Sequence, residues 1–347
     1  MSEAPPVARH DSAEMRKPRK SDPLLQVGVV AIGRNEGVRI ETCIRSVVAR
    51  AAIVVYVDSG STDDSVVLAQ GAGAEVVSLD MSLPFTAARA RNHGYQCLRQ
   101  LAPGLSYIQF VDGDCEIDAN WIATASAFLD LNQDVAVVCG RRRERFPSQS
   151  IYNKLCDLEW DTPIGQAKAC GGDALIRVNA FEQVGGYRED LIAGEEPELC
   201  LRLRAAGWEI WRLDAEMTRH DAAMLHFSQW WRRHVRSGYA FAQGAYLHGR
   251  TAERHWVWET ARALLWGMAV PIVSLLAFAF LGPWGLLLLL IYPLQFLRRL
   301  PKHPGPLLMQ CQLTFFELLT RFPESFGALS FLRDRVLVRQ GRLIEYK

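Results

Sequence analysis

The 347-residue sequence lacks several patterns that mark common protein classes. Its eight cysteines form no CxxC pair, which argues against a zinc site or a thiol-redox motif and favours reduced, mostly buried thiols in a cytosolic compartment. No Gly-x-Gly-x-x-Gly or Gly-Lys-Ser/Thr pattern follows the first apolar segment, which argues against a dinucleotide-dependent dehydrogenase or a P-loop enzyme. A formal net charge of +1 shows no basic excess, so we expect no nucleic-acid partner.

The N-terminal segment also lacks the apolar core of a secretory signal. Residues 1–23 are polar, contain proline and carry the basic run Arg16-Lys17-Pro18-Arg19-Lys20. We interpret them as a disordered basic tail that is either solvated or in contact with anionic lipid. The folded part of the chain is therefore expected to begin at residue 24.

Apolar strand-like and helix-like segments alternate in the part of the chain that follows. Strands are expected at residues 24–32, 52–57 and 74–78 and again from Tyr107, with helices between them. This alternation indicates βαβ units, and hence an α/β fold with a largely parallel sheet. Each strand runs into a polar loop, and ligands bind beyond the carboxyl ends of the strands in such sheets.

The strand that begins at Tyr107 ends in two carboxylates, Asp112 and Asp114, separated by Gly113. Alternate residues of an extended segment point to the same side, so both carboxylates are expected to converge beyond the strand. Like charges this close repel each other unless a cation lies between them. Carboxylates suit Mg²⁺ or Mn²⁺ bound together with substrate phosphates. A solvated Asp-Gly-Asp turn is the alternative for this tripeptide alone.

Polar residues at two other strand ends and on one helix are further candidates for ligand binding. Asp58, Ser59 and Gly60 follow the second strand and offer a carboxylate, a hydroxyl and backbone amides to a base or ribose. Glu36 follows the first strand, and Arg91 lies on a helix where it could pair with a diphosphate. Plainer alternatives exist for the last two: a first-turn acid favoured by the helix dipole, and an ordinary ion pair.

Seven short segments, in order and at matching spacing, resemble glycosyltransferase family 2. They are Val30–Glu36 (VAIGRNE), Val57–Asp63 (VDSGSTD), Ala90–Gly94 (ARNHG), Asp112–Asp114 (DGD), Gly171–Arg177 (GGDALIR), Phe181–Tyr187 (FEQVGGY) and Gly194–Leu203 (GEEPELCLRL). The resemblance implies a GT-A fold, a doubly wound sheet that binds a nucleotide-diphosphate sugar. Within a catalytic domain at residues 24–245, residues 24–115 would be the nucleotide-binding half and residues 116–245 the acceptor half. It also implies inverting transfer.

The resemblance further assigns roles by position. Nine residues would bind the nucleotide sugar: Ile32, Arg34, Glu36, Asp58, Ser59, Gly60, Arg91, Asp112 and Gly113. Asp112 and Asp114 would also hold Mg²⁺ or Mn²⁺. His220, which follows a strand expected near residues 208–213, would complete the metal site, and imidazole is a suitable Mn²⁺ ligand. A structural histidine is the alternative.

Two adjacent acids, Glu195 and Glu196, stand where the family usually has Glu-Asp. By position, Glu196 would be the general base that removes the acceptor hydroxyl proton as the oxygen attacks the anomeric carbon. Because glutamate is one methylene longer than aspartate, Glu195 is a second candidate for the catalytic base. An acidic helix start around Pro197 is the structural alternative.

The C-terminal third is apolar. Residues 263–281 carry no charge and have about the length of a bilayer-spanning helix, and residues 284–297 are again uncharged after a Gly-Pro turn. Arginine and lysine residues flank both outer ends, which would place both ends in the cytoplasm. We expect a membrane-associated helical hairpin at residues 246–300, spanning or re-entrant, and amphipathic helices at residues 301–347. A buried helical pair in a soluble core is the alternative.

These observations predict a metal-dependent, inverting glycosyltransferase at the inner membrane, with its catalytic domain facing the cytoplasm. It would move a sugar from a nucleotide-diphosphate donor to a hydroxyl of a membrane-held acceptor, such as a lipid-linked saccharide or polysaccharide. A nucleotidyltransferase and a non-catalytic membrane scaffold of a polysaccharide assembly complex are the alternatives. The acidic pair and the hairpin favour sugar transfer, and the acids Asp112, Asp114 and Glu196 argue against a scaffold.

Overall fold

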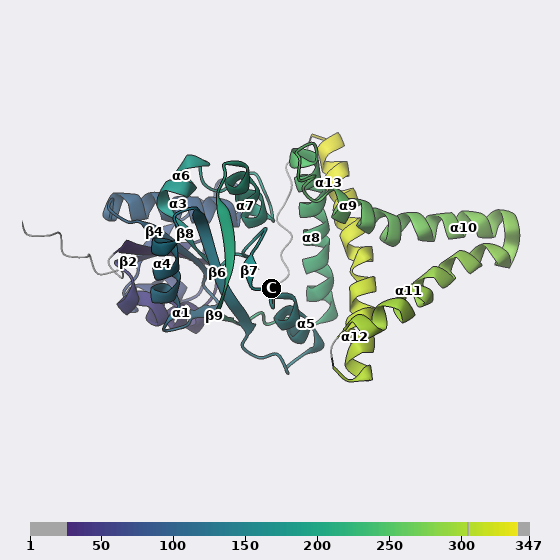
Figure 1. Ribbon diagram of the computed structural model, residues 1–347, viewed down its shortest axis with the longest axis horizontal. Helices are drawn as coiled ribbons and strands as arrows, with labels where there is room; N and C mark the ends of the chain where they lie inside the picture. The colour runs from purple at the N-terminus through teal and green to yellow at the C-terminus, as the bar shows by residue number, and fades with distance from the viewer. Residues whose placement is uncertain (1–25, 304, 339–347) are drawn as a thin grey trace, which may run out of the picture.

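The computed structural model describes residues 26–303 and 305–338. Figure 1 shows an α/β part, a pair of long helices beside it, and an apolar helical arm that projects from this pair. The tail predicted at residues 1–23 lies outside the described residues, as does the end of the segment predicted to form amphipathic helices. A sheet with helices on both faces confirms the predicted α/β class.

One mixed nine-stranded sheet forms the centre of the α/β part. Its parallel strands are the ones predicted from the sequence: β1 (Val27–Gly33), β2 (Ile53–Asp58), β3 (Glu75–Ser78) and β4 (Tyr107–Asp112). The others are β5 (Cys115–Ile117), β6 (Val135–Glu144), β7 (Gly165–Gln166), β8 (Ala174–Arg177) and β9 (Glu209–His220). Because β8 runs antiparallel to both β4 and β6, the expectation of a largely parallel sheet holds for β1–β4 and is wrong for the second half.

The reversed direction of β8 brings an additional loop to the ligand edge of the sheet. Ala174, the first residue of β8, lies opposite Phe110 of β4, so the loop before β8 reaches the carboxyl end of β4. A strand parallel to β4 would instead begin at the opposite edge, after a long crossover. Hydrophobic periodicity does not reveal this direction, because β8 has four residues and all are buried.

Helices cover both faces of this sheet, as in a doubly wound fold. One face packs against α1 (Val38–Val47), α2 (Ser65–Gly71) and α4 (Trp121–Leu131), and the short helix η2 (Val48–Arg50) follows α1. The other face packs against α3 (Ala87–Leu101), α6 (Val178–Gln183) and α7 (Glu195–Ala205). Gly94 lets α3 approach closely, because a Cβ there would lie 2.4 Å from Cγ1 of Val30.

Two long helices, α8 (Phe227–His248) and α13 (Arg321–Val336), stand beside the sheet, with α5 (Ile151–Glu159) and α12 (Leu307–Leu319) near one end (Figure 1). Their backbones touch where each helix has a glycine. A Cβ at Gly238 would lie 1.9 Å from the carbonyl oxygen of Glu324, and one at Gly327 would lie 1.9 Å from that of Val235. Only glycine permits this approach, which fixes α13 against α8.

The apolar arm is a helical hairpin. Its outward arm comprises α9 (Val257–Leu264), the π-helical turn η3 (Leu265–Ala269) and α10 (Val270–Leu281), and its return arm comprises η4 (Gly282–Leu290), α11 (Ile291–Arg299) and η5 (Leu300–Lys302). The chain reverses at Gly282, whose φ of 61° favours glycine. The return arm packs so closely that a Cβ at Gly285 would lie 2.2 Å from the backbone of Ala277, and the Tyr292 hydroxyl donates to the Trp266 carbonyl.

The hairpin buries little of its apolar surface inside the protein. Val257–Lys302, taken through its turn, is a helical stretch long and apolar enough to cross a membrane, with a hydropathy of 2.3 and only 11% of its most apolar window buried. Phe280 is 85% exposed and Trp284 is 75% exposed. A buried pair in a soluble core does not describe these helices, because exposed apolar surface on this scale marks an interaction site.

Candidate active site

Strand register places the predicted nucleotide-binding residues along one edge of the sheet. Ile32 lies opposite Asp112 across the β1–β4 pair, and Gly33 lies opposite Asp58 across β1–β2. The amide of Gly113 donates to the Ile32 carbonyl at 2.8 Å, which holds the turn after β4 against β1. The carboxyl ends of three parallel strands therefore form a common floor.

The loop after β2 is organised by the carboxylate of Asp58, which is buried. Its Oδ2 accepts hydrogen bonds from the amides of Gly60 and Ser61 at 3.1 and 3.0 Å. The neighbouring Ser59 hydroxyl is also buried and has no hydrogen-bond partner within residues 26–303 and 305–338. A buried hydroxyl without a partner is costly unless a ligand satisfies it, so Ser59 is placed as a ligand contact would be.

The loop after β1 is tied to the loop after β2. The side-chain oxygen of Asn35 accepts from the Thr62 amide at 2.8 Å, and Asn35 has a φ of 56°. Glu36 pairs with Arg39 at 2.7 Å. It precedes Gly37, the N-cap of α1, and therefore lies outside the first turn of the helix. Arg34 is exposed at the tip of the same loop. A hydrogen bond thus links the two loops at the edge of the site.

Arg91 is buried and links two acids. Its NH2 lies 2.8 Å from Oδ1 of Asp112, and its NH1 lies 2.6 Å from Oε1 of Glu195. Arg142 of β6 contacts the other oxygen of Asp112 at 3.1 Å, and its guanidinium lies 4.9 Å from the Trp160 ring. Asp112 is therefore held between two arginines, and Arg91 forms the internal ion pair that was the alternative to a diphosphate contact.

Asp114 pairs instead with His220, at the end of β9. His220 Nε2 lies 3.2 Å from Oδ1 of Asp114, and β5–β9 pairing sets Cys115 opposite His220. The strand β4 ends at Asp112, and a turn at Gly113 intervenes before β5. The alternation of an extended strand therefore does not continue to Asp114, whose contact is His220 while Asp112 contacts the arginines.

The Asp114–His220 pair suits a divalent cation. Burial, with the nearby Arg142 charge, lowers the pKa of His220 to about 3, so its imidazole is neutral and has a lone pair to give. Its Nδ1 is buried and has no hydrogen-bond partner among the described residues, and it lies 3.9 Å from Oε2 of Glu144. Ligand atoms of Asp114, Cys115 and His220 lie within 4.8 Å of one another. This donor set fits a metal ion.

Asp173 is a site residue that the sequence analysis did not single out. It is fully buried at the start of β8, where its Oδ1 accepts from the Asp112 amide at 3.0 Å and its Oδ2 from the Thr218 hydroxyl at 2.9 Å. A Cβ at the preceding Gly172 would lie 2.8 Å from NH2 of Arg91 and 3.3 Å from Oδ2 of Asp112. Both residues fall in the Gly171–Arg177 segment, so that segment was the available signal.

Arg142 and Trp160 were also missed, and no local pattern indicates them. Arg142 lies in a run of three arginines on β6 that resembles a solvated charge cluster in the sequence. Trp160 follows α5 and stands edge-on to His220, with ring centroids 4.7 Å apart. Only the folded chain shows that this aromatic ring borders both the arginine and the histidine.

The two acids at the start of α7 occupy different surroundings. Glu195 is fixed by Arg91, on the Asp112 side of the site. Glu196 is buried, and its Oε1 accepts from the Cys170 amide at 2.6 Å and from the thiols of Cys170 and Cys200, each at 2.9 Å. Burial raises the pKa of Glu196 above its usual range. A carboxylate with a raised pKa is better suited to accept a proton than one held by a guanidinium.

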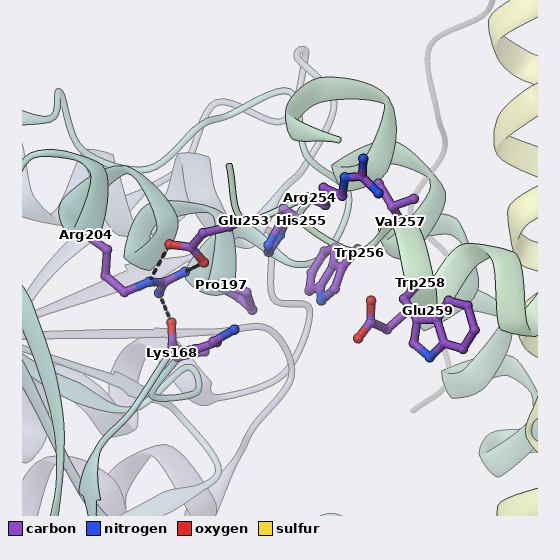
Figure 2. A pocket seen from close by; sticks show the side chains of 11 residues that line it. Lys168, Pro197, Arg204, Glu253, Arg254, His255, Trp256, Val257, Trp258 and Glu259 are labelled. Carbon is purple, nitrogen blue, oxygen red and sulfur yellow. Dashed lines mark hydrogen bonds and ion pairs between the residues drawn. The ribbon is translucent and has the colours of Figure 1, made fainter. Parts of the chain in front are cut away.

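A cavity of about 410 Å³ lies next to these acids, between the start of α7 and the segment that leads into α9. Pro197 lines it, as do Trp256 and Trp258 (Figure 2). Trp256 has a left-handed backbone with φ of 56°, and its ring would lie 2.6 Å from a Cβ at Gly194, the residue before Glu195. The entry to the hairpin thus packs directly on the turn that carries both acids.

Comparison with known proteins identifies part of the chain. Residues 29–184 match the model of the family described as "Glycosyl transferase family 2". The succinoglycan biosynthesis protein ExoA of Rhizobium meliloti (strain 1021) is 28% identical over 196 residues, which are 52% of this chain and 58% of that protein. The matched region therefore spans less than two thirds of that relative.

One solved structure has a similar fold. A mannosyltransferase from Pyrobaculum calidifontis, in complex with GDP-Man and Mn²⁺, has a TM-score of 0.56 at 17% sequence identity, and the match covers 92% of each chain. Glucosyl-3-phosphoglycerate synthase from Mycobacterium tuberculosis covers 56% of this chain and 71% of its own, at 20% identity and a TM-score of 0.37. The likeness to the mannosyltransferase confirms the GT-A-like fold.

Proposed function

The chain belongs to glycosyltransferase family 2 through residues 29–184, and we propose that it is an inverting, metal-dependent transferase with a membrane-held acceptor. Its donor is a nucleoside-diphosphate sugar. One observation carries the proposal: at one sheet edge, buried ion pairs join Asp112 to a candidate base-bearing helix, and Asp114 meets a neutral histidine.

We propose that the donor lies along the floor formed by β1, β2 and β4. Asp58 and Ser59 face the nucleoside, where the buried Ser59 hydroxyl gains a partner. Arg142 and Arg91, both within 3.1 Å of Asp112, place positive charge beside the proposed position of the diphosphate. Gly172 keeps this space open, because a side chain there would meet Arg91 and Asp112.

Asp114 and His220 are the proposed metal ligands, with the thiol of Cys115 adjacent. A bound Mn²⁺ or Mg²⁺ supplies positive charge that offsets the charge developing on the departing diphosphate. Nε2 of His220 faces Asp114 at 3.2 Å, and the Glu144 carboxylate lies 3.9 Å from Nδ1 on the other side of the ring. The archaeal mannosyltransferase binds GDP-Man with Mn²⁺, which supports the same pairing of a nucleotide sugar and a metal here.

Glu196 is the proposed general base. Its raised pKa suits removal of a proton from the acceptor hydroxyl while that oxygen attacks the anomeric carbon. Attack from the face opposite the diphosphate inverts the configuration. Glu195, held at 2.6 Å by Arg91, is a positioning residue that ties the start of α7 to Asp112.

The acceptor is proposed to enter from the membrane side. The exposed apolar hairpin would insert into the cytoplasmic membrane, and the cavity is lined both by residues at the start of that hairpin and by Pro197, the residue after Glu196. Trp256 and Trp258 line the cavity, and tryptophan is favoured at the level of lipid headgroups. A lipid-linked saccharide in polysaccharide assembly would thereby present its sugar hydroxyl to the base, in keeping with the succinoglycan role named for the relative.

The test is donor turnover by the full chain in detergent or lipid. A panel of UDP-, GDP- and dTDP-sugars is offered with Mn²⁺ or Mg²⁺ and a lipid extract, and the released nucleoside diphosphate is measured. We expect metal-dependent release from one donor, stimulated by the extract. Release without metal, or nucleotide binding with no dependence on Asp114, would contradict the proposed site.

A further inference from the structure

Three potential metal ligands meet beside the proposed base, outside the Asp114–His220 site. Cys170 lies in the loop before β8, while Glu196 and Cys200 lie one turn apart on α7. Oε1 of Glu196 is 2.9 Å from each sulfur, and the two sulfurs are 3.7 Å apart. All three ligand atoms lie within 4.8 Å of one another. This cluster is called the thiol–glutamate cluster below.

Its geometry fits a tetrahedral metal ion better than a disulfide. Two thiolates bound at about 2.3 Å with a tetrahedral angle lie about 3.8 Å apart, close to the observed 3.7 Å. A disulfide needs its sulfurs at about 2.05 Å, which would pull the loop towards α7. Residues i and i+4 share a helix face, so Glu196 and Cys200 present their ligand atoms on the same side of α7. Around an ion bound at about 2.0 Å by oxygen and about 2.3 Å by sulfur, the 2.9 Å oxygen–sulfur distances open to about 3.5 Å.

Charge and softness favour a thiophilic cation over Mg²⁺ or Mn²⁺. Cysteine sulfur selects Zn²⁺ and similar ions, whereas Mg²⁺ and Mn²⁺ prefer oxygen ligands. Burial raises the pKa of the Cys200 thiol to about 11 and that of Cys170 well above its usual range, so both are protonated in the described state. Binding one dication releases both thiol protons to solvent, and the ion takes their place between sulfur and carboxylate.

We propose that Cys170, Glu196 and Cys200 bind Zn²⁺ or another thiophilic divalent cation. The bound ion occupies the carboxylate of Glu196, so it cannot accept the acceptor proton. The site is therefore inhibitory, and this consequence rests on the proposed function while the binding itself does not. The thiol–glutamate cluster differs from the Asp114–Cys115–His220 group, because that group contains a single thiol.

Cobalt binding tests the proposal without an activity assay. The purified full chain, kept reduced by a non-thiol reductant, is titrated with Co²⁺, and the thiolate-to-cobalt charge-transfer absorption is recorded. We expect one equivalent of bound Co²⁺ to show a two-thiolate intensity that Zn²⁺ displaces, in addition to any Co²⁺ bound at the Asp114–His220 site. Cys200→Ser should halve the intensity and weaken binding by about tenfold or more. His220→Ala should leave the band unchanged, and so should the matched control Cys97→Ser on α3.

Each contrary result is informative. A band that His220→Ala removes and Cys200→Ser leaves intact would assign the ion to the Asp114 site and overturn the proposal. No thiolate band in a folded, reduced chain would also overturn it. Cys170→Ser provides a second variant on a partly exposed loop if Cys200→Ser fails to fold. In the donor assay, Zn²⁺ added over excess Mn²⁺ should inhibit the wild type and spare Cys200→Ser, and inhibition of both alike would contradict the consequence.

Discussion

The α/β part and the hairpin satisfy opposite physical requirements. In the α/β part the strands are buried and charged groups are buried in pairs, as in the Arg91 contacts to Asp112 and Glu195. In the hairpin the apolar side chains face outward, with Phe280 85% exposed. The first region buries its apolar surface within the protein, whereas the second exposes it. The comparison indicates that the α/β part carries the reactive groups and that the hairpin sets where the protein is held. The two parts meet where Trp256 packs on Gly194.

The largest expected effect separates the two acids of α7. Glu196→Gln should lower turnover by roughly 10²–10⁴-fold, because it removes the proton acceptor. It should also stabilise the fold at neutral pH. Burial raises the pKa of Glu196, so the folded chain holds that proton more tightly than the unfolded chain, and stability falls as pH rises from about 4.5 through the raised value. Melting temperature against pH for both chains checks the second effect.

Glu195→Gln is the matched control for that experiment. It should reduce turnover less and lower stability, because it removes a partner of the buried Arg91. The opposite pattern, with Glu196→Gln active and Glu195→Gln inactive, would transfer the role of base to Glu195.

The next effect probes the buried charges of the α/β part. Arg91→Met should lower the free energy of unfolding by about 3–5 kcal/mol, because it removes the buried cation that contacts Glu195 and one of the two arginines that contact Asp112. Arg45→Met breaks an exposed pair with Glu41 and should cost less than about 1 kcal/mol. Denaturant unfolding of both variants gives the two values, and equal losses would show that the buried network has no special role.

A smaller effect tests the hairpin. Leu276→Arg places a charge on α10, where the leucine is 56% exposed, and should weaken membrane partitioning by about 2.5–3.5 kcal/mol. Leu131→Arg, at the end of α4 and 84% exposed, should have no effect, because that surface faces water. The measurement is the fraction of chain that sediments with vesicles of defined composition. Equal partitioning of both variants would refute the difference drawn between the two regions.

The smallest effect concerns the junction between the regions. Burial lowers the pKa of His234, on α8, to about 3, so the folded chain stays neutral where the unfolded chain gains a proton near pH 6.5. Stability should therefore decline as pH falls below 6.5, by at most about 1.4 kcal/mol per pH unit. His234→Gln should flatten this decline, and the exposed His93→Gln on α3 should not. Unfolding free energies measured between pH 7 and 5 decide the matter.

The first half of the sheet, β1–β4, could be predicted from the sequence, whereas the second half could not. β1–β4 were predicted to within a few residues, because each is an apolar run bounded by polar turns. The second half resisted prediction because β6 ends in charged residues and β8 has only four residues. The hairpin could be predicted because its residues are apolar and uncharged over a long stretch. Its π-helical turn precedes Pro271, which has no amide hydrogen to donate to the preceding turn of a regular helix.

The position of a site residue could be predicted from the sequence when the residue lies at the end of an apolar strand. Asp58, Asp112 and Asp114 follow apolar strands, so their placement at the sheet edge could be inferred. The partners of these acids could not, because Arg142 and Asp173 approach from elements whose order in the sheet differs from their order in the chain. The absence of a CxxC pair argued against a thiol metal site, yet folding brings the sulfurs of Cys170 and Cys200 within 3.7 Å.

Donor turnover by wild type and Asp114→Ala in the same lipid preparation tests the central claim most directly. The account predicts metal-dependent release of nucleoside diphosphate from one sugar donor by the wild type. It predicts a loss of roughly 10³-fold in the variant with its membrane partitioning unchanged, because the metal site and the hairpin lie in separate parts. Equal turnover by both chains, or variant turnover restored without metal, would contradict it.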